Sequence, residues 1–570
     1  MGRNTEPARS FGAVDAPLSC AVREVHVKDA RRKLCGWGYE GQGLTAAEAE
    51  TFRSQTEERF GVPLEPRANV PRVDDFDLRA PRLKPPSSLG NLFRDDPYER
   101  LLHAYGKSFP DAVRMFRREV PEPPDLVAYP ATTEDVVRIL DWAGDAGAAA
   151  IPFGGGSSVV GGVEPAVGDS YAGAVTIDLL KLDRVLEVDR ASRAARIQGG
   201  ARGPHIEAQL REYGLTLRHF PQSFEHSTLG GWIATRSGGH FASLYTHIDD
   251  FVEATTTVTP RGIMETRRLP GSGAGPSPDR MVIGSEGILG VITEAWMRLQ
   301  DRPTFRGSAA VHFADYASAA EAVRMLAQSG LYPSNCRLID AQETATAGAG
   351  DGSTSLLVLG FESADHPVEP WMNRALELTA DCGGDHSASA GRSHREGAAG
   401  AWRDAFIKGP YFREVGVPLG VIGDTFETAI TWDRFADFHA RIMARTPEIL
   451  EQATGRPGRV TCRFTHVYPD GPAPYFTFSA LGDWDRLAQQ WREIKLAANE
   501  AVVDAGGTVT HHHAVGRDHR PAGYDRQRPD VFARALAGAK AAVDPDGLMN
   551  PGVLIDPRGR AVGVTGSMAP

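Results

Sequence analysis

The chain has 570 residues, of which 41% are hydrophobic and 24% are charged, and its formal net charge is −11. This length accommodates two or more domains, and the composition is ordinary for a globular protein. The negative charge argues against nucleic acid as the main partner, because a phosphate backbone requires a basic face. There is no run of about 18 apolar residues of the kind that spans a membrane as a helix.

The cysteines and the ends of the chain indicate a reducing compartment. The five cysteines are widely spaced and form no Cys-x-x-Cys pair, which argues against a disulfide framework and against a zinc knuckle. The first thirty residues carry charges throughout, and the last residues include no peroxisomal tripeptide. We therefore expect a cytoplasmic location.

The first half of the chain begins with a polar, arginine-rich extension, residues 1–85, with a predicted helix at 46–60. From about residue 125 the pattern changes to that of a strand–helix–strand unit. A short strand at 125–130 is followed by a helix from residue 132 with apolar residues at helical spacing, and then by a strand at 149–153.

The second strand of this unit runs into a glycine-rich loop with two hydroxyl side chains. Consecutive glycines leave backbone N–H groups bare, and such groups in a tight loop form a concavity that binds phosphate. An ordinary glycine-rich connection is the alternative. The loop is not a Rossmann fingerprint, because Val159 stands where a glycine is needed, and no Gly-Lys-Ser/Thr follows as in a Walker loop. The residues of this loop are Pro152, Phe153, Gly154, Gly155, Gly156, Ser157 and Ser158.

Two more segments rich in glycine and hydroxyl groups follow, at 221–239 and 284–293. The first is too long for an ordinary connection, and its apolar residues Leu229, Trp232 and Ile233 favour burial over a surface loop. Between and around these segments the pattern predicts strands at 175–179, 185–189, 194–198 and 255–258, a helix at 204–213 and a hairpin turn at 259–262.

After about residue 302, helices alternate with strands in a pattern typical of an α+β domain with an antiparallel sheet. The expected elements are helices at 317–329, 485–504 and 531–542 and strands at 355–361, 461–468, 475–479 and 509–513. On a strand at 509–513, side chains alternate, so His511 and His513 would share one face.

The run His511-His512-His513 has three interpretations. A metal site would need a further ligand and usually a nearby carboxylate, and we predict no metal here. A solvated polar run is the second. The third, which we favour, is an active-site cluster, because imidazole titrates near neutrality and can move protons or contact phosphate.

The three glycine–hydroxyl segments, followed by an antiparallel domain and the ending Asp544-Pro545-Asp546-Gly547-Leu548-Met549-Asn550-Pro551-Gly552, resemble the vanillyl-alcohol oxidase/p-cresol methylhydroxylase family. The resemblance implies an α+β fold in which FAD lies between two subdomains and an antiparallel-sheet cap covers the flavin ring. The expected parts are an N-terminal extension at 1–85, an FAD-binding domain at 86–302, a cap domain at 303–520 and a C-terminal segment at 521–570 that returns to the FAD domain.

Within this group, several motifs are similar in order to those of the alkyldihydroxyacetonephosphate synthase family. They are Gly36-Trp37-Gly38-Tyr39, Ser227-Thr228-Leu229-Gly230-Gly231-Trp232, Thr259-Pro260-Arg261-Gly262, Gly284-Ser285-Glu286-Gly287, Phe426-Glu427-Thr428 and the histidine run. The resemblance implies a transferase that replaces the acyl group of acyl-dihydroxyacetone phosphate by a fatty alcohol, through an adduct at flavin N5 and without net redox change. The alternative is an FAD-linked oxidase or dehydrogenase of a 2-hydroxy acid or another alcohol.

The resemblance also implies which residues bind FAD. Ser157 stands where many members carry a histidine attached to the flavin, so we expect FAD to be bound non-covalently. Besides the glycine loop, the residues expected to line the flavin and ribityl chain are Gln222, Ser223, Phe224, Glu225, His226, Ser227, Thr228, Thr235, Arg236, Ser237, Gly238, Glu286, Gly287, Ile288, Leu289, Gly290, Val291 and Ile292.

By the same resemblance, Tyr475 is the catalytic acid/base, with Tyr468 as a nearby competitor, and His511, His512 and His513 move protons. Two arginines correspond to functional positions, and each has an ion pair as the alternative interpretation. Arg413 would bind the substrate phosphate or pair with Glu414 or another carboxylate, and Arg337 would also bind substrate or pair with Asp340.

The partners implied are a lipid-phosphate substrate and a fatty alcohol. Peripheral contact with a membrane and assembly into a homodimer are both left open by the sequence.

Overall fold

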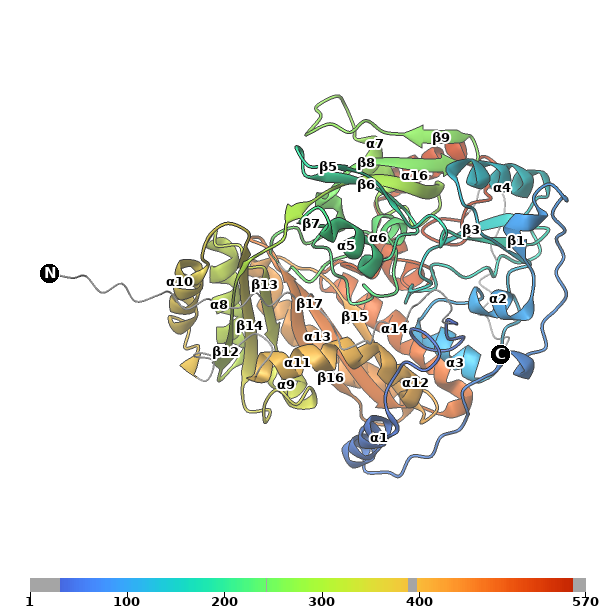
Figure 1. Ribbon diagram of the computed structural model, residues 1–570. Coiled ribbons are helices and arrows are strands. Elements are labelled where there is room, and N and C mark those ends of the chain that lie inside the picture. Colours follow the sequence, from blue (N-terminus) through green and yellow to red (C-terminus); the bar gives the residue numbers. More distant parts are fainter. Residues whose placement is uncertain (1–30, 242, 388–396, 557–570) are drawn as a thin grey trace.

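The computed structural model describes residues 31–241, 243–387 and 397–556 (Figure 1). In this part of the chain the first sheet has four strands in the order β1-β2-β4-β3, in which β2, β4 and β3 run parallel. Helix α4 (Thr133–Asp145) connects β2 to β3 and buries its apolar residues against the sheet. Its N-terminus is capped by Thr132, whose side chain accepts a hydrogen bond from the Asp135 backbone N–H. The strands of this sheet are β1 (Phe93–Arg94), β2 (Leu126–Ala128), β3 (Ala149–Phe153) and β4 (Ala174–Asp178).

The second sheet has five strands in the order β5-β6-β10-β8-β9, and its pairs are antiparallel. Helix α6 (Leu229–Thr235) packs its residues Leu229 and Ile233 on this sheet, against Ile197 and Ile292. The strands and helices of this region are β5 (Val185–Asp189), β6 (Ala194–Gln198), α5 (Gly203–Arg211), β7 (Leu215–Thr216), β8 (Val252–Thr259), β9 (Gly262–Glu265), α7 (Pro278–Val282), β10 (Val291–Arg298) and β11 (Gln300–Asp301).

The third large sheet has six antiparallel strands in the order β12-β14-β13-β16-β17-β15. Its strands and neighbouring helices are β12 (Phe305–Phe313), α8 (Tyr316–Gln328), β13 (Asn335–Ile339), α9 (Ala341–Thr346), β14 (Ser355–Ser363), α10 (Glu369–Ala380), α11 (Gly397–Lys408), α12 (Phe412–Gly416), β15 (Val421–Glu427), α13 (Trp432–Thr454), β16 (Arg459–Val467), β17 (Pro472–Leu481) and α14 (Leu487–Asp504).

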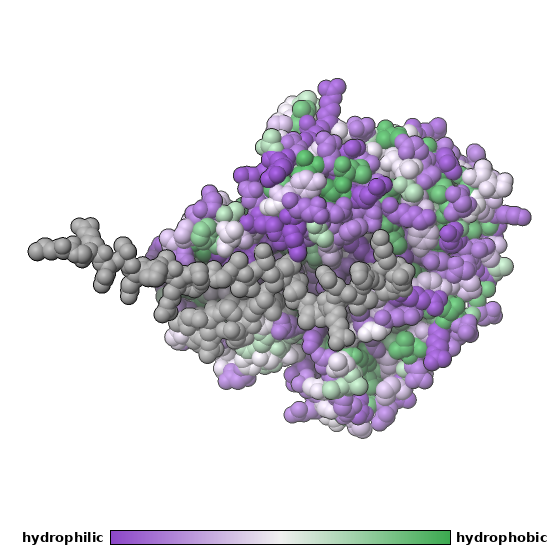
Figure 2. All heavy atoms as spheres, in the orientation of Figure 1, coloured by the Kyte–Doolittle hydropathy of each residue, from purple (hydrophilic) through white to green (hydrophobic). Residues whose placement is uncertain are grey.

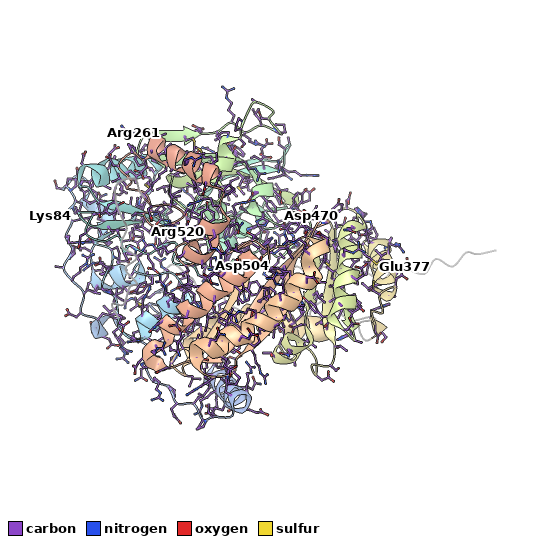
Figure 3. All side chains as sticks on the ribbon, turned by 180° about the vertical axis from the view of Figure 1, so that it is seen from behind. Lys84, Arg261, Glu377, Asp470, Asp504 and Arg520 are labelled. Atoms are coloured by element: carbon purple, nitrogen blue, oxygen red, sulfur yellow. The ribbon has the colours of Figure 1, made fainter. Side chains whose placement is uncertain are left out.

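Long helices cover one face of this six-stranded sheet, as Figure 3 shows from behind. Phe426 on β15 and Phe476 on β17 face α13 and α14, where they pack with Phe438 and Trp491 in the largest apolar core of the described residues. Because side chains alternate along a strand, the residues next to these phenylalanines point to the opposite face, toward the four- and five-stranded sheets.

The N-terminal part of the chain reaches the six-stranded sheet. Helix α1 (Ala46–Phe60) starts in a capping box, in which Thr45 and Glu48 satisfy each other's backbone N–H groups. Phe52 and Phe60 pack on Leu419 and Val421 at the β15 edge, and Figure 1 shows α1 beside α12. Two further helices, α2 (Pro97–Leu102) and α3 (Phe109–Phe116), connect this region to β2.

The last described segment returns to the first sheet after α15 (Asp525–Gln527) and α16 (Asp530–Val543). Met549 forms a parallel bridge with Ala150 of β3. The buried Lys540 ammonium donates to the carbonyls of Ile288 and Met549 and to the carboxylate of Asp544, at 2.6–2.8 Å. The turn after α16 is therefore tied to the third glycine–hydroxyl segment, through Ile288, and to β3, through Met549.

On the face of the molecule in Figure 2, hydrophilic residues predominate and hydrophobic ones are scattered between them. Among the residues that the structure describes, no helix is long and apolar enough to cross a membrane.

Most elements lie where the sequence pattern places them, but one expected strand is wrong. The segment 509–513 is not a strand: it bends, because its backbone N–H groups bind a side chain instead of a neighbouring strand. In the segment 221–239, Leu229, Trp232 and Ile233 are buried as expected, and they lie on helix α6, which the sequence pattern did not predict. The sequence also predicts that the last ten residues are untethered, and these lie outside the residues that the structure describes.

Replacing Lys540 with methionine should strongly destabilise the fold, because it leaves the Asp544 carboxylate buried without its cation. We expect the free energy of unfolding to fall by about 3–5 kcal/mol in urea titrations. The matched control is Arg445→Met on α13, where an exposed ion pair with Glu448 is lost and the change should stay within about 0.5 kcal/mol. Equal effects of the two substitutions would contradict this account.

Candidate active site

A cavity of about 620 Å³ lies between the six-stranded sheet and the part of the fold formed by the four- and five-stranded sheets. The glycine loop after β3 forms one wall, and side chains from β13, β15, β16 and β17 form the other. The segments before and after α6 and the segment before β10 close the sides. All three glycine–hydroxyl segments therefore meet at one space.

The glycine loop packs so closely on residues 226–228 that a side chain has no room. A Cβ atom at Gly154 would lie 2.1 Å from the Thr228 Oγ1 atom, and one at Gly155 would lie 1.9 Å from the His226 carbonyl oxygen. Thr228 Oγ1 is itself buried without a hydrogen-bond partner in the described part of the chain. A cradle of bare backbone with an unpartnered hydroxyl at its edge fits the pyrophosphate and ribityl oxygens of FAD.

Glu286 connects this wall to the end of the chain. Its carboxylate accepts the backbone N–H groups of Val515 and Gly516 at 2.8 and 2.7 Å, and its carbonyl accepts the Asn550 side-chain amide. Burial raises the pKa of Glu286 to about 7, against the effect of these two hydrogen bonds. Glu286, which lies just before β10 on the cavity wall, is thus held by the segment that follows the histidine run.

Most of the residues expected to bind FAD line the cavity. Those on its wall are Pro152, Phe153, Gly154, Gly155, Gly156, Ser157, Ser158, Gln222, Ser223, Ser227, Thr228, Thr235, Ser237, Gly238, Glu286, Gly287, Gly290, Val291 and Ile292.

Six of the expected FAD residues lie outside the lining. Phe224 stacks on Trp232, and Glu225 is exposed. Ile288 and Leu289 are buried in an apolar cluster with Val553. The remaining two are His226, which faces a smaller pocket behind the glycine loop, and Arg236, which ends α6 and pairs with Asp249.

On the opposite wall, strand register places polar residues in a row. Tyr475 on β17 is directly opposite Glu427 on β15 and Arg463 on β16. Directly opposed residues of antiparallel strands share a face, so these three side chains lie together toward the cavity. Arg337 on β13 belongs to the same face, because it is two residues from Ile339, which is opposite Arg463.

Tyr475 is enclosed by cationic and aromatic groups. The Arg463 guanidinium lies 3.9 Å from its ring centroid, and the rings of His512 and His513 lie at 6.0 and 5.5 Å. Burial raises the pKa of Tyr475, and the charge of Arg463 partly offsets that effect. The phenol is therefore protonated in the free site, next to groups that can exchange its proton.

Glu427 holds the histidine run in place. Its buried carboxylate accepts the backbone N–H groups of His511, His512 and His513 and the hydroxyl of Thr510. Burial disfavours the ionised form of Glu427, but the neighbouring histidines and these hydrogen bonds outweigh it and lower the pKa of the carboxyl below its ordinary value.

The three histidines point in different directions. His512 and His513 line the cavity. His511 does not, and its Nε2 atom lies 2.7 Å from the Tyr468 hydroxyl and 3.1 Å from Nε2 of His247. The expectation that His511 and His513 share a strand face is therefore wrong. Burial lowers the pKa values of all three imidazoles, which are neutral at pH 7.

The two expected substrate arginines both line the cavity but differ in their partners. Arg413 donates to the Asp424 carboxylate at 3.0 Å and to the Lys107 carbonyl at 2.6 Å, while Glu414 pairs with Lys33. Arg337 does not pair with Asp340. No carboxylate of the described residues is within 4.0 Å of its guanidinium, which donates a hydrogen bond to Nδ1 of His240 at 3.2 Å.

Several residues of this wall were not identified as functional from the sequence. Glu427 stands out in the sequence only as part of the Phe426-Glu427-Thr428 motif, and Arg463, His240 and His466 belong to no motif given above. The sequence pattern does indicate the orientation of Arg463. It lies between Cys462 and Phe464 in a buried strand, and because those two side chains face the apolar core, Arg463 points to the opposite face.

Comparisons with known proteins agree with this arrangement. Residues 124–267 match the family model for an FAD binding domain, and residues 302–554 match the model for the C-terminal domain of FAD linked oxidases. The alkyldihydroxyacetonephosphate synthase of Dictyostelium discoideum is 30% identical over 493 residues, which are 82% of this chain and 79% of that protein. The chain belongs to the alkyldihydroxyacetonephosphate synthase family.

Solved structures support the same assignment. A structure of an alkyldihydroxyacetonephosphate synthase matches with a TM-score of 0.76 and 25% identity, over 91% of this chain and 98% of that one. A p-cresol methylhydroxylase with bound substrate matches with a TM-score of 0.63 and 15% identity, over 82% and 94% of the two chains, which shows the shared fold. The predicted α+β fold of the vanillyl-alcohol oxidase type is confirmed, and this family member is an FAD-dependent enzyme.

The burial of Glu286 predicts a pH dependence of stability. Its pKa in the fold, about 7, exceeds the ordinary value of 4.5, so the folded state holds a proton that the unfolded state releases. The free energy of unfolding of flavin-free protein should therefore fall as the pH rises from about 4.5 to 7. In Glu286→Gln this part of the slope should disappear in urea titrations. A variant curve parallel to that of the wild type would contradict the assignment.

Ser157 predicts that FAD is held without a covalent bond. By the resemblance described above, Ser157 stands where a covalently attached histidine would be expected. Denaturing the FAD-loaded protein with acid should release all flavin absorbance into the supernatant. Flavin fluorescence that stays with the precipitated or gel-separated chain would overturn this prediction.

Proposed function

We propose that this enzyme converts acyl-dihydroxyacetone phosphate and a fatty alcohol into the alkyl ether and a free fatty acid. The observation that carries the proposal is that Tyr475, His512, His513 and Arg337 line the same cavity as the glycine loop. The exchange breaks the carbon–oxygen bond to the acyloxy group and forms one to the alcohol oxygen, so it needs no oxidant or reductant. Bound FAD would supply the reactive nitrogen of its ring system to the substrate carbon.

Arg337 is the strongest candidate for holding the substrate phosphate. Its side chain is 3% exposed, and its charge lies over the rings of Trp402 and Phe406, 5.0 and 5.2 Å from their centroids. Its buried Nε–H has no partner in the described chain. Burial and the nearby Arg463 lower the pKa of Arg337 to about 9, which still leaves it charged at pH 7. A buried cation without a carboxylate is stabilised by an anion, and the guanidinium fork suits phosphate.

Arg413 has a different role in this proposal. Its ion pair with Asp424 and its bond to the Lys107 carbonyl hold α12 against the six-stranded sheet at the cavity wall. Its remaining donors can contact a ligand from this fixed position, whereas Arg337 provides the uncompensated charge.

Tyr475 and the histidines move the protons of the exchange. The Tyr475 hydroxyl would exchange a proton with the substrate carbon. His513, whose ring centroid is 5.5 Å from that of Tyr475, would then return the proton to Tyr475. A neutral imidazole has a lone pair that can accept a proton, and the charge of Glu427 opposes the burial that lowers the pKa of His513. Glu427 fixes their backbone and balances the positive charge that forms when a proton arrives.

The cavity also provides room for the alkyl chains. It extends from Tyr475 under α1, where it is lined by the apolar side chains of Phe52, Phe60, Val417, Val421 and Phe478. An apolar extension next to a polar end that carries Arg337 fits a substrate with a long hydrocarbon chain and a charged head.

The decisive experiment is anaerobic mixing of FAD-loaded enzyme with palmitoyl-dihydroxyacetone phosphate and hexadecanol. We expect release of palmitate and formation of the ether, while the flavin absorbance returns to that of the oxidised form. Lasting bleaching of the flavin by D-lactate or glycolate, without palmitate release from the ester, would support the oxidase alternative and overturn the proposal.

Replacing Tyr475 with phenylalanine should lower kcat about a hundred- to ten-thousandfold, because a general acid/base is lost. The matched variant Tyr468→Phe removes a hydroxyl that contacts His511 outside the cavity, and it should change kcat by about tenfold or less. Single-turnover assays of palmitate release measure both. A larger effect at Tyr468 would make that residue the acid/base.

Arg337→Met should raise KM for the phosphate substrate about ten- to a hundredfold, as expected for the loss of charged hydrogen bonds, and should change KM for hexadecanol little. Arg306→Met, which removes a half-exposed arginine at the edge of the same sheet, is the control and should leave both constants unchanged. An unchanged KM for the phosphate substrate in Arg337→Met would move the phosphate site to Arg413.

A further inference from the structure

Two histidines far from the run in sequence complete a cluster with it. His466 at the end of β16 and His247 before β8 both lie beside His511, with ring centroids at 4.8 and 4.6 Å. One ring nitrogen each of His466, His511 and His512 lies within 4.8 Å of the other two. The expectation of no metal considered the run alone, where a further ligand was missing. The fold supplies that ligand.

Hydrogen bonds within the cluster fix the tautomers of His466 and His511, so that in each ring one nitrogen carries the proton and the other has a free lone pair for a metal ion. Nε2 of His466 is 2.7 Å from the Gly239 carbonyl oxygen, so this nitrogen carries the proton and Nδ1 keeps its lone pair. That Nδ1 atom is buried and has no partner among the described residues. Ligating histidines generally donate their second ring N–H to such a carbonyl or to another acceptor, which fixes the tautomer.

His511 is oriented in a similar way. Nδ1 of His247 is 3.0 Å from the Arg236 carbonyl oxygen and donates to it, which leaves Nε2 of His247 as an acceptor. The facing Nε2 of His511, 3.1 Å away, then carries a proton, and the Tyr468 oxygen lies beside it. Nδ1 of His511 is left with its lone pair, 3.0 Å from Nδ1 of His512.

The Nδ1 atoms of His511 and His512 are 3.0 Å apart, which is close to the separation of two ligands in a metal site. Two nitrogens bound to Zn²⁺ at about 2.0–2.1 Å in tetrahedral geometry lie about 3.3–3.4 Å apart. Glu427, 3.5 Å from Nδ1 of His512, supplies a negative charge near the cluster. His466 and His512 line the main cavity, so an ion has a path to the site and a fourth position can face the cavity.

We propose that His466, His511 and His512 form a Zn²⁺ site on the wall of the cavity, with His247 as the residue that orients His511. The ion binds three imidazole nitrogens and leaves one position for water or an oxygen of the substrate. On the basis of the proposed function, Zn²⁺ inhibits the exchange, because an imidazole bound to metal cannot carry a proton.

The test of binding needs no substrate. FAD-loaded protein, first dialysed against a chelator, is titrated with Zn²⁺ by calorimetry, and with Co²⁺ while its d–d absorbance is followed at wavelengths beyond the flavin bands. We expect one ion per chain and a tetrahedral Co²⁺ spectrum. Absence of binding, or an octahedral spectrum typical of weak surface sites, would overturn the site.

The matched variant is His466→Gln, because the glutamine Nε2–H can still donate to the Gly239 carbonyl while the ligand Nδ1 is removed. We expect Zn²⁺ to bind at least about tenfold more weakly, with FAD content unchanged. His366→Gln, which changes a half-exposed histidine elsewhere, should bind as the wild type does. If His466→Gln loses FAD, His511→Gln takes its place. Equal affinity in the wild type and the ligand variant would overturn the assignment.

The inhibitory consequence is measured separately, by palmitate release at increasing Zn²⁺. Inhibition should follow the binding curve and should be reversed by chelator. Tight binding without inhibition would overturn this consequence and would show that the imidazoles of the cluster do not carry the protons of the reaction, which is a different result from a failure of Zn²⁺ to bind.

Discussion

The buried carboxylate of Glu427 is the interaction on which the site depends. It lies at the end of β15 and accepts three consecutive backbone N–H groups of the histidine run and the Thr510 hydroxyl. Because this side chain takes the place of a neighbouring strand, the run bends, and its histidines point in different directions. Without such a partner, the three buried N–H groups would each be unsatisfied at a substantial cost in free energy.

Glu427 also belongs to a row of polar groups whose positions depend on the packing of the apolar core. Strand register sets Glu427, Tyr475 and Arg463 side by side on one face, while the phenylalanines between them anchor the other face on α13 and α14. The packing of that core therefore determines the spacing of the polar groups. On the opposite wall, Glu286 and Asn550 tie the glycine loop to the segment that follows the histidines. Both walls are thus connected through residues 510–516.

How far sequence reasoning reached depended on whether a feature was local. Helix α1 at 46–60 and the strands at 149–153 and 185–189 follow from caps, glycines and apolar spacing, and they have the expected bounds. The strand at 509–513 was wrong because its hydrogen-bond partner, Glu427, is more than 80 residues away. His466 and His247 were not assigned to the cluster for the same reason, since nothing in their own segments marks them as neighbours of His511.

The sequence by itself determined the flavin-binding fold and its family through the resemblance of its motifs, because their residues and their order can be read directly along the chain. The tertiary structure alone decided which groups face one another. Arg337 is buried without a carboxylate partner, whereas Arg413 has one. His511 points away from the cavity, and His466 lies in a cluster with His511 and His512. These outcomes depend on strand register and on competition between distant side chains for the same hydrogen bonds, and both arise only when the sheets pack together.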